Sequence, residues 1–252
     1  MMFVIPMAGE SRRFRDACYT VPKYMLPLGT GFLFDHAVRS FATYFSTDEF
    51  LFVSRPDAVD FAKARCDALG ITNSKFAIMD RATSGQAETV FLGLEQAQVP
   101  RDMQIAIFNI DTFRPGYRKP GFLTAAECEG YLEVFEGEGA NWSFVAPDPS
   151  NPSRVAATAE KRAISNLCCT GLYYFRKTED FLWAYGHPAS PASDAERKER
   201  YVAPLYNALI ARGKRIRFEI VARSEVIFCG TPEEYAQVQA SDEVMIRLAR
   251  DA

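Results

Sequence analysis

Short apolar segments alternate with amphipathic segments through the first 111 residues of the chain, and this alternation constrains the fold more than any other feature. Apolar runs of strand length occupy residues 2–6, 50–54, 75–79 and 104–109. Between them, in residues 34–45, 56–69 and 86–98, apolar side chains recur every three or four positions, as on one face of a helix. Strands and helices in alternation predict right-handed crossovers and a parallel sheet covered on both faces.

The pattern changes after Asp111. Residues 131–135, 142–146, 155–159 and 172–176 read as strands with no long helix between them, so we expect an antiparallel or mixed extension of the sheet. The chain is therefore predicted to form a single α/β domain over residues 1–252, with a first half at 1–111 and a second half at 112–252. Prolines and serines make residues 186–194 the best candidate for a poorly ordered segment.

The composition is typical of a globular protein. Hydrophobic residues make up 48% of the chain, which supplies ample core, and the formal net charge of −3 comes from acidic and basic residues mixed along the sequence. A nucleic-acid binder would show a basic face instead, and no apolar run approaches the ~18 residues of a membrane span. We therefore expect a cytoplasmic protein without nucleic-acid or membrane partners.

The six cysteines are scattered, without a C-x-x-C pair, and only two histidines accompany them. Cys66 falls in a helical pattern, and Cys168 and Cys169 begin an apolar run. This distribution disfavours a zinc site and predicts reduced, mostly buried thiols.

The loop after the first predicted strand carries the strongest functional signal. The apolar residues end at a small-residue turn, Ala8 and Gly9, which is followed by Arg12 and Arg13 and, ten residues after Arg13, by Lys23. Such a turn can present backbone N–H groups in a nest, arginine can hold phosphate oxygens with two N–H groups, and lysine adds a point charge. We therefore expect a polyanion such as a nucleotide here; the alternative is a surface loop whose arginines are only solvated.

A second signal is the carboxylate of Asp111, which follows the apolar run that begins at Ile105. Ligands collect outside the carboxyl ends of parallel strands, so an aspartate there is well placed to hold magnesium. Magnesium takes few protein carboxylates and completes its shell with water and substrate phosphate oxygens. The alternative is an aspartate that only caps the following turn through Thr112.

Two further segments have the features of helix starts. Residues 83–90 form a small-residue turn that leads into a predicted helix, and we expect Ser84 as its N-cap with Glu88 near the first turn, where an acid favours the helix dipole. Residues 231–234 predict a capping box, with Thr231 at the N-cap, proline at the first helical position and Glu234 at the third.

In the order of its motifs the chain resembles the sugar-phosphate nucleotidyltransferases. Five elements carry the resemblance: the turn at 7–14 with Pro22 and Lys23, the turn at 83–90, the strand before Asp111, the segments at 160–166 and 169–175, and the segment at 228–235. They cover nearly the whole chain. The resemblance implies a three-layer α/β/α sandwich with a mostly parallel, mixed central sheet, a Rossmann-like fold of the GT-A type.

The resemblance also assigns roles to individual residues. Arg13 would hold the leaving pyrophosphate, Lys23 would neutralise charge near the reacting phosphate, and Asp111 would be the principal ligand of Mg²⁺, for which Mn²⁺ can substitute. The residues implied at the nucleotide are Met7, Ala8, Gly9, Glu10, Ser11, Arg12 and Arg13, with Gly85, Gln86 and Ala87 against the base. Those implied at the phosphorylated acceptor are Asn109, Glu160, Lys161, Thr170 and Gly171.

Some positions depart from the family's pattern. Ser11 stands where the second glycine usually lies, Arg12 stands in a threonine or serine position, and Arg162 replaces the proline after the Glu-Lys pair. Phe228 occupies the position of an aspartate that completes the metal site in many members, and Glu225 is the nearest acid.

The implied function is that of a nucleotidyltransferase. It would join the nucleoside monophosphate of a nucleoside triphosphate to a sugar 1-phosphate or similar small phosphomonoester, release pyrophosphate, and supply an activated precursor for polysaccharide or glycan synthesis. One alternative is a nucleotide-sugar-dependent glycosyltransferase, which normally carries an Asp-x-Asp motif where this chain has Asn109-Ile110-Asp111. The other is a non-catalytic nucleotide or sugar-phosphate binding protein, which Phe228 favours. The nucleobase, the acceptor and the oligomeric state stay open, a homo-oligomer included.

Overall fold

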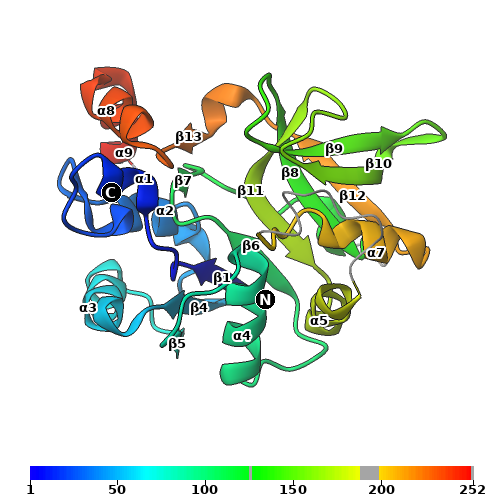
Figure 1. Cartoon of the computed structure of the whole chain (residues 1–252), viewed down its shortest axis with the longest axis horizontal. Helices are drawn as coiled ribbons and strands as arrows, with labels where there is room; N and C mark the ends of the chain where they lie inside the picture. The colour runs from blue at the N-terminus through cyan, green and yellow to red at the C-terminus, as the bar shows by residue number, and fades with distance from the viewer. Residues whose placement is uncertain (125–126, 188–198, 251–252) are drawn as a thin grey trace.

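The computed structural model describes residues 1–124, 127–187 and 199–250. Within these residues the chain forms a nine-stranded sheet in the order β5-β4-β1-β6-β11-β8-β12-β10-β9 (Figure 1). Its strands are β1 (Met2–Pro6), β4 (Glu49–Ser54), β5 (Ser74–Ile78), β6 (Ile105–Phe108), β8 (Gly130–Glu136), β9 (Ser143–Asp148), β10 (Asn151–Glu160), β11 (Leu167–Phe175) and β12 (Ile216–Ile220).

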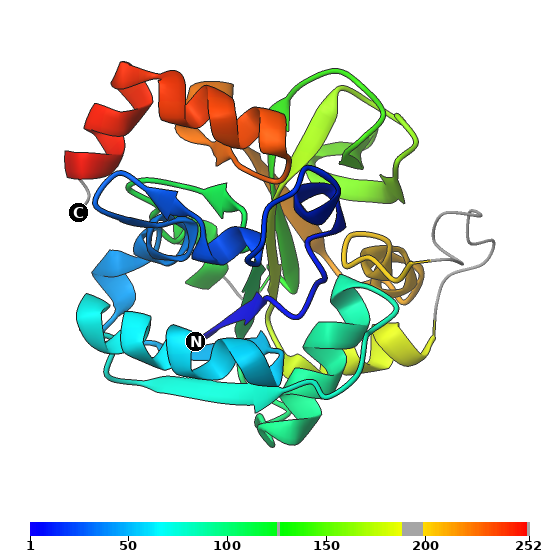
Figure 2. The ribbon, with the colours of Figure 1, turned by 60° about the vertical axis from the view of Figure 1, so that its left-hand side comes forward.

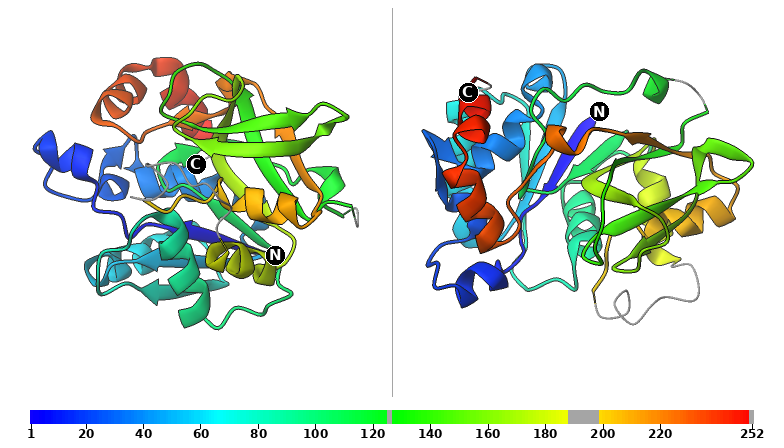
Figure 3. Two further views of the ribbon diagram at one scale, coloured as in Figure 1. Left: turned by 45° about the vertical axis from the view of Figure 1, so that its right-hand side comes forward. Right: turned by 90° about the horizontal axis from the view of Figure 1, so that it is seen from above.

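The sheet is parallel in its first half and mixed in its second. β1 pairs in parallel with β4 and β6, and β4 pairs in parallel with β5. β11 then runs antiparallel to both β6 and β8, β12 runs parallel to β8, and β10 runs antiparallel to β12 and β9. β9 also returns to β11, where Phe144 pairs with Cys168. One sheet therefore continues through both halves of the chain and ends in the β9–β10 hairpin, which Figure 3 shows from two sides.

Helices cover both faces of the sheet, which confirms the three-layer α/β/α architecture (Figure 2). The α-helices are α1 (Arg12–Asp16), α2 (Leu33–Arg39), α3 (Val59–Leu69), α4 (Gln86–Gln96), α5 (Thr178–Gly186), α7 (Leu205–Ala211), α8 (Pro232–Ala240) and α9 (Asp242–Arg250). The 3-10 turns are η1 (Lys23–Met25), η2 (Ala42–Tyr44), η3 (Pro56–Ala58), η4 (Gly121–Thr124) and η5 (Arg223–Glu225). Two small ladders pair β2 (Pro27–Leu28) with β3 (Gly31–Phe32), and β7 (Thr112–Phe113) with β13 (Ile227–Phe228).

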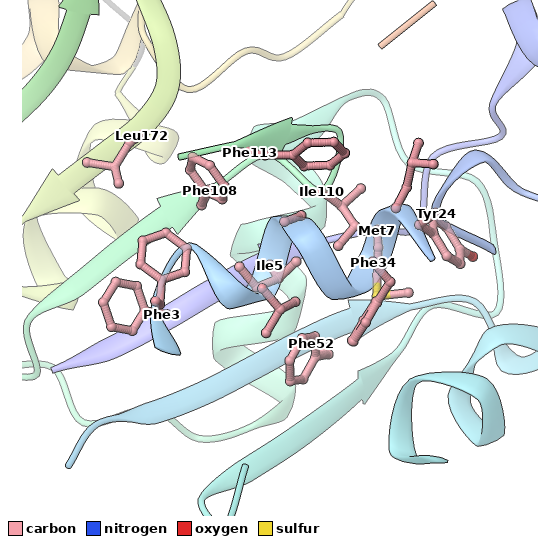
Figure 4. Close-up of a cluster of buried hydrophobic side chains, with 14 of the residues drawn as sticks. Phe3, Ile5, Met7, Tyr24, Phe34, Phe52, Phe108, Ile110, Phe113 and Leu172 are labelled. Carbon is pink, nitrogen blue, oxygen red and sulfur yellow. The ribbon is translucent and has the colours of Figure 1, made fainter. Parts of the chain in front are cut away.

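Alternate residues of β1 belong to two different cores. Phe3 and Ile5 pack in the core on the side of α2 and α3, whereas Met2 and Val4 pack in the core on the side of α4 and α7. Figure 4 shows Phe3 and Ile5 among the buried side chains of neighbouring strands. Because successive side chains of a strand point to opposite faces, a strand covered on both faces must be apolar throughout. This burial explains the continuous apolar runs of the first half.

The predicted elements are confirmed with shifts of up to five residues at their ends, and several further elements were not predicted, among them α1 and α9. The helix expected over residues 34–45 is wrong at its end, because α2 stops at Arg39 and a separate 3-10 turn, η2, follows. β12 was not predicted, nor were α5 and α7, the helices described between β11 and β12. The cysteines are free thiols; Cys18 is exposed and the others are buried, as expected. Of the stretch expected to be poorly ordered, residues 188–194 lie outside the described residues.

In the part of the chain that the structure describes, no helix combines the length and the apolar character needed to cross a membrane.

Candidate active site

The loop between β1 and α1 offers backbone donors beside open space. The side chains of Met7 and Ala8 are buried, and the Met7 N–H donates to the carbonyl of Val53 over 2.8 Å. Gly9 is exposed, and no hydrogen bond within the described residues uses the backbone N–H groups of Gly9 or Glu10. A Cβ added at Gly9 would meet no atom within 4 Å. Free N–H groups in a small-residue turn suit a phosphate.

Ser11 adopts the backbone conformation that glycine favours. Its φ of 51° and ψ of 39° are left-handed, and its carbonyl accepts the N–H groups of Phe14 and Arg15 as α1 begins. The Ser11 hydroxyl oxygen accepts the backbone N–H of Lys23 over 3.2 Å. The serine therefore holds a left-handed turn at some conformational cost, and its hydroxyl bonds the loop to Lys23.

The arginines of this loop differ in their partners. Arg12 and Arg15 form ion pairs with the Glu10 carboxylate at 2.9 and 3.2 Å. The hydrogen bond from Arg12 is the main cause that lowers the pKa of Glu10. Arg13 is exposed, and its guanidinium has no hydrogen-bond or ion-pair partner among the residues that the structure describes. It is therefore the arginine of α1 whose charge is available to an anion.

Lys23 and Asp111 meet at a small pocket. The Lys23 Nζ lies 2.5 Å from the Asp111 Oδ2, and the two side chains are 22% and 20% exposed. Lys23 belongs to η1 and Asp111 to the turn between β6 and β7, so residues far apart in sequence meet at the carboxyl ends of the parallel strands. The pocket is lined by Lys23 and Tyr24 of η1, by Ile110 next to Asp111, and by residues at and after the end of β1: Pro6, Met7, Gly9 and Ser11.

The segment around Gly230 passes close to Asp111. The Cys229 N–H donates to the Asp111 carbonyl over 2.8 Å, and β13 pairs Phe228 with Thr112 of β7. A Cβ added at Gly230 would lie 3.0 Å from the Asp111 Oδ2, so a side chain there would crowd this carboxylate. The capping box predicted at Thr231 is confirmed.

Phe228 brings an aromatic ring, not an acid, to this side of Asp111. Its ring packs against those of Trp142 and Phe135, with centroids 4.8 and 5.4 Å away. Glu225 does not replace the missing acid, because its carboxylate pairs with the Arg114 guanidinium at 3.0 Å. Among the described residues, no group of three or more His, Cys, Asp and Glu side chains could hold a metal ion. Asp111 is the carboxylate on which the predicted metal site would depend. The Glu234 carboxylate also lies near Gly230, where it accepts the N–H groups of Gly230 and Thr231.

The predicted base-binding turn contacts Asn109, which in turn lies against Gly171 of the second half. The Gln86 amide donates to the Asn109 side-chain oxygen over 2.6 Å. Gly171 has a φ of 101°, and a Cβ there would lie 2.5 Å from the Asn109 side-chain nitrogen, so its missing side chain accommodates Asn109. Ser84 was expected as the N-cap of α4, and this is wrong: Gly85 is the N-cap, while the N–H and hydroxyl of Ser84 donate to Glu88. Ser84 therefore binds the side chain of Glu88, at the third helical position, and does not cap the helix.

Three of the predicted acceptor residues, Glu160, Lys161 and Thr170, bind different partners. Glu160, at the end of β10, is 6% exposed and accepts a hydrogen bond from the Ser143 hydroxyl. Lys161 follows with a left-handed φ of 52°, and its ammonium donates to the Tyr201 hydroxyl. Thr170 is buried and donates to Glu133 over 3.0 Å, so it does not join the other predicted residues. Tyr201 was missed by the sequence analysis, because a single tyrosine among charged residues gives no local signal.

Comparison with solved structures shows the family to which the chain belongs. The structure is similar to the nucleoside-diphosphate-sugar pyrophosphorylase from Vibrio cholerae RC9, with a TM-score of 0.89, 48% sequence identity, and coverage of 95% of this chain and 100% of that chain. The chain belongs to this family of sugar-phosphate nucleotidyltransferases. The family and the enzyme class predicted from the motifs are thereby confirmed.

More distant nucleotidyltransferases share the fold. The inositol-1-phosphate CTP transferase from T. maritima has a TM-score of 0.74 and 13% identity, over 99% of this chain and 95% of that chain. A UDP-glucose pyrophosphorylase in complex with UDP-glucose has a TM-score of 0.75 and 16% identity, over 94% of this chain and 96% of that chain. No protein-family profile matches the chain, and no curated protein matches it in sequence. At these identities the distant relatives support the fold alone.

Proposed function

We propose that this nucleotidyltransferase joins a nucleoside monophosphate to a small phosphomonoester, with a sugar 1-phosphate as the first candidate. A phosphate oxygen of the acceptor attacks the α-phosphorus of a nucleoside triphosphate, and the bond from that phosphorus to the oxygen bridging to the β-phosphate breaks. Pyrophosphate leaves with the electron pair of that bond. The observation that carries the proposal is the Lys23–Asp111 pair, at 2.5 Å, beside a loop with free N–H donors.

Three groups of the first half would act on the triphosphate. The N–H groups of Gly9 and Glu10 would bind phosphate oxygens, and the unpartnered guanidinium of Arg13 would hold the leaving pyrophosphate. Lys23 would turn its ammonium from Asp111 to the reacting phosphate. In phosphoryl transfer, positioning and charge neutralisation supply most of the rate enhancement. A few well-placed cations therefore suffice for this reaction.

Asp111 is the residue that would hold a divalent ion, for which we propose Mg²⁺ with Mn²⁺ as a substitute. One partly exposed carboxylate fits Mg²⁺, which keeps several waters and takes phosphate oxygens as ligands. When bound, the ion would neutralise charge on the triphosphate. Because the ammonium of Lys23 lies against Asp111 in the free protein, we expect the ion to bind weakly until a triphosphate accompanies it.

The second half would bind the acceptor. Lys161 would contact the acceptor phosphate, and Glu160 would accept hydrogen bonds from acceptor hydroxyls. From the first half, Gln86 would lie beside the base, and Asn109, which accepts the Gln86 amide, would lie at the acceptor. The two halves, 1–111 and 112–252, would thus largely divide the two substrates between them. We also propose the cytoplasm as the location of the reaction, since nucleoside triphosphates are made and used there.

A substrate panel tests the proposed function. Each of the four nucleoside triphosphates is combined with several sugar 1-phosphates and with inositol 1-phosphate, and pyrophosphate release is measured with Mg²⁺, with Mn²⁺ and with a chelator. CTP with inositol 1-phosphate, which the name of one structural relative gives, belongs in the panel. UTP with glucose 1-phosphate belongs there too, since their reaction would form UDP-glucose, which another relative binds. We expect at least one pair to release pyrophosphate in a metal-dependent way.

The same panel separates the alternatives. A glycosyltransferase would consume a nucleotide sugar without pyrophosphate release. A binding protein would bind a triphosphate, as measured by calorimetry, yet release no pyrophosphate with any acceptor or metal. Either result would replace the proposed reaction.

A further inference from the structure

The segment 199–201 crosses from the acceptor side of the site to the base-binding turn. The backbone N–H of Arg200 donates to the carbonyl of Ser84 over 2.7 Å, and the N–H of Ala87 donates to the carbonyl of Arg200 over 2.9 Å. Gly85, between them, has a φ of 133°, and a Cβ there would lie 2.6 Å from the Arg200 carbonyl oxygen. The absence of a side chain at Gly85 is what lets the two backbones pair.

The hydroxyl of Tyr201 holds the ammonium of Lys161. Lys161 donates to the Tyr201 oxygen, and the Tyr201 hydroxyl donates in turn to the Glu199 carboxylate. The Lys161 Nζ also lies 4.7 Å from the centre of the Tyr201 ring and 3.9 Å from the Glu199 Oε2. Although the Lys161 side chain is 39% exposed, it is therefore held in one orientation by contacts from one short segment.

Charged groups from both sides of the site surround the Tyr201 hydroxyl. Burial raises the pKa of Tyr201, and the hydrogen bond to Glu199 and the negative charge of Glu160 act in the same direction. The positive charge of Arg13 acts weakly in the opposite direction, so Arg13 lies near enough to influence the phenol. Tyr201 consequently stays a neutral hydroxyl, able to accept a bond from Lys161 and to donate one to Glu199 at once.

We propose that Tyr201 is a positioning residue for the acceptor phosphate, acting through Lys161. An ammonium carries three N–H donors, so the bond to Tyr201 leaves two for phosphate oxygens. A flexible four-carbon side chain that is already oriented loses less conformational freedom when it binds. The backbone of Arg200 fixes the segment to the turn at Gly85, so the orientation of Lys161 depends on the nucleotide side of the site. This inference rests on the proposed function of Lys161.

Tyr201→Phe tests the positioning role, since it removes one hydroxyl oxygen and keeps the ring. The assay uses the triphosphate and the sugar 1-phosphate that release most pyrophosphate in the substrate panel. We expect KM for the sugar 1-phosphate to rise about tenfold, while KM for the triphosphate and kcat change less than about twofold. Tyr185→Phe is the matched control, because the ring face of Tyr185, which carries Arg200 at 4.3 Å, is kept. It should behave as the wild type.

A second measurement does not depend on turnover. Acetic anhydride is added in small amounts to wild type, Tyr201→Phe and Tyr185→Phe, and acetylation of Lys161 is compared by peptide mass spectrometry with that of Lys75, an exposed lysine paired with Glu49. Loss of the Tyr201 bond should raise the relative reactivity of Lys161 about threefold in Tyr201→Phe alone. Unfolding temperatures of the three proteins exclude global loosening.

The outcomes distinguish the two proposals. If wild type releases no pyrophosphate with any pair, the proposed function fails, and the labelling alone decides whether Tyr201 orients Lys161. If wild type is active but Tyr201→Phe leaves the acceptor KM unchanged, the positioning role is overturned. Equal Lys161 reactivity in all three proteins overturns it as well.

Discussion

The two sides of the site treat their charged groups differently. On the nucleotide side, the guanidinium of Arg13 has no partner among the described residues and Lys23 has a single carboxylate partner. On the acceptor side, polar groups bind one another: Ser143 donates to Glu160, and Lys161 is bound to Tyr201. The first side offers a polyanion the free guanidinium of Arg13, whereas the second offers groups that bonds within the protein have already oriented. We infer that the triphosphate is held mainly by charge and the acceptor mainly by fit.

Polar groups buried deeper in the molecule also bond one another. Behind the acceptor side, the Arg114 guanidinium is shared by the buried carboxylate of Glu133 and by Glu225, and Thr170 donates to Glu133. Burial raises the pKa of Glu133 and the charge of Arg114 opposes that rise. Such a satisfied network stabilises one arrangement of β8, β11 and β7 and leaves no charge for a ligand. The acceptor side is therefore built on a rigid base.

The largest expected effect is that of Asp111→Asn. The substitution keeps the shape of the side chain but removes the charge on which metal binding would depend, and it should lower pyrophosphate release about a thousandfold or more. Nucleotide binding, measured by calorimetry, should persist because the N–H groups of the first loop remain. Asp16→Asn, an exposed aspartate on α1, is the control. Retained activity in Asp111→Asn would remove this carboxylate from the mechanism and weaken the contrast between the two sides.

Arg13→Ala and Lys23→Ala should each lower turnover about a hundredfold, because each removes one cation from the charge developing on the phosphates. Arg15→Ala removes an arginine of the same helix that is already paired with Glu10. It should cost little activity. The comparison depends on this difference between free and paired arginines, so equal losses in Arg13→Ala and Arg15→Ala would contradict it.

The elements and the first loop could be predicted from the sequence because their signals are local. Burial on both faces makes β1 apolar throughout, and a small-residue turn followed by arginines marks the loop after it. The conformation of Ser11 could not be predicted from its residue type, because glycine favours left-handed backbone more than serine does. The serine nevertheless adopts a φ of 51°, and its hydroxyl accepts the Lys23 N–H. The family resemblance supplied the roles, which residue patterns alone do not fix.

The acceptor side could not be predicted to the same depth, because its contacts join residues far apart in sequence. The bond between Lys161 and Tyr201 spans 40 residues, and the one between Ser143 and Glu160 spans 17. Thr170 is an example of what a motif does not fix. It lies next to Gly171 in sequence, but its hydroxyl donates to the buried carboxylate of Glu133. Only the register of β11 against its neighbours decides such orientations, and sequence periodicity does not set register across a bulge.

Gln86→Ala tests the turn before α4, where the two sides of the site meet. Loss of the amide should reduce the preference for the best triphosphate over the other three by about tenfold, because an unpaired polar group beside the base costs ~1–3 kcal/mol of selectivity. The rate with the best triphosphate should fall by less. Gln96→Ala, at the other end of α4, removes an amide that accepts the Ile78 N–H instead. It should leave the ranking unchanged. An unaltered ranking in Gln86→Ala would show that the base is read elsewhere.

The smallest expected effect concerns stability at the turn before α4. The Glu88 carboxylate accepts bonds from the hydroxyl and N–H of Ser84 and pairs with Arg81 at 2.9 Å. The Ser84 hydroxyl is the first of the causes that lower the pKa of Glu88 from 4.5 to about 2. A carboxyl with a lowered pKa in the folded state stabilises the fold fully above its ordinary pKa. That contribution is lost as the pH falls from about 4.5 through about 2.

Glu88→Gln should therefore lower the free energy of unfolding by about 1 kcal/mol at pH 7, a figure that allows for screening by solvent at the edge of the site. The difference from wild type should shrink as the pH approaches 2. Urea denaturation at several pH values measures both. Glu95→Gln, on the same helix, removes an exposed ion pair with Arg101 and should cost less than about 0.5 kcal/mol. A loss in Glu88→Gln that is independent of pH would mean that shape, and not charge, fixes this turn. The nucleotide side would then depend on packing as the acceptor side does, and the contrast between the two would no longer hold for the residues that support them.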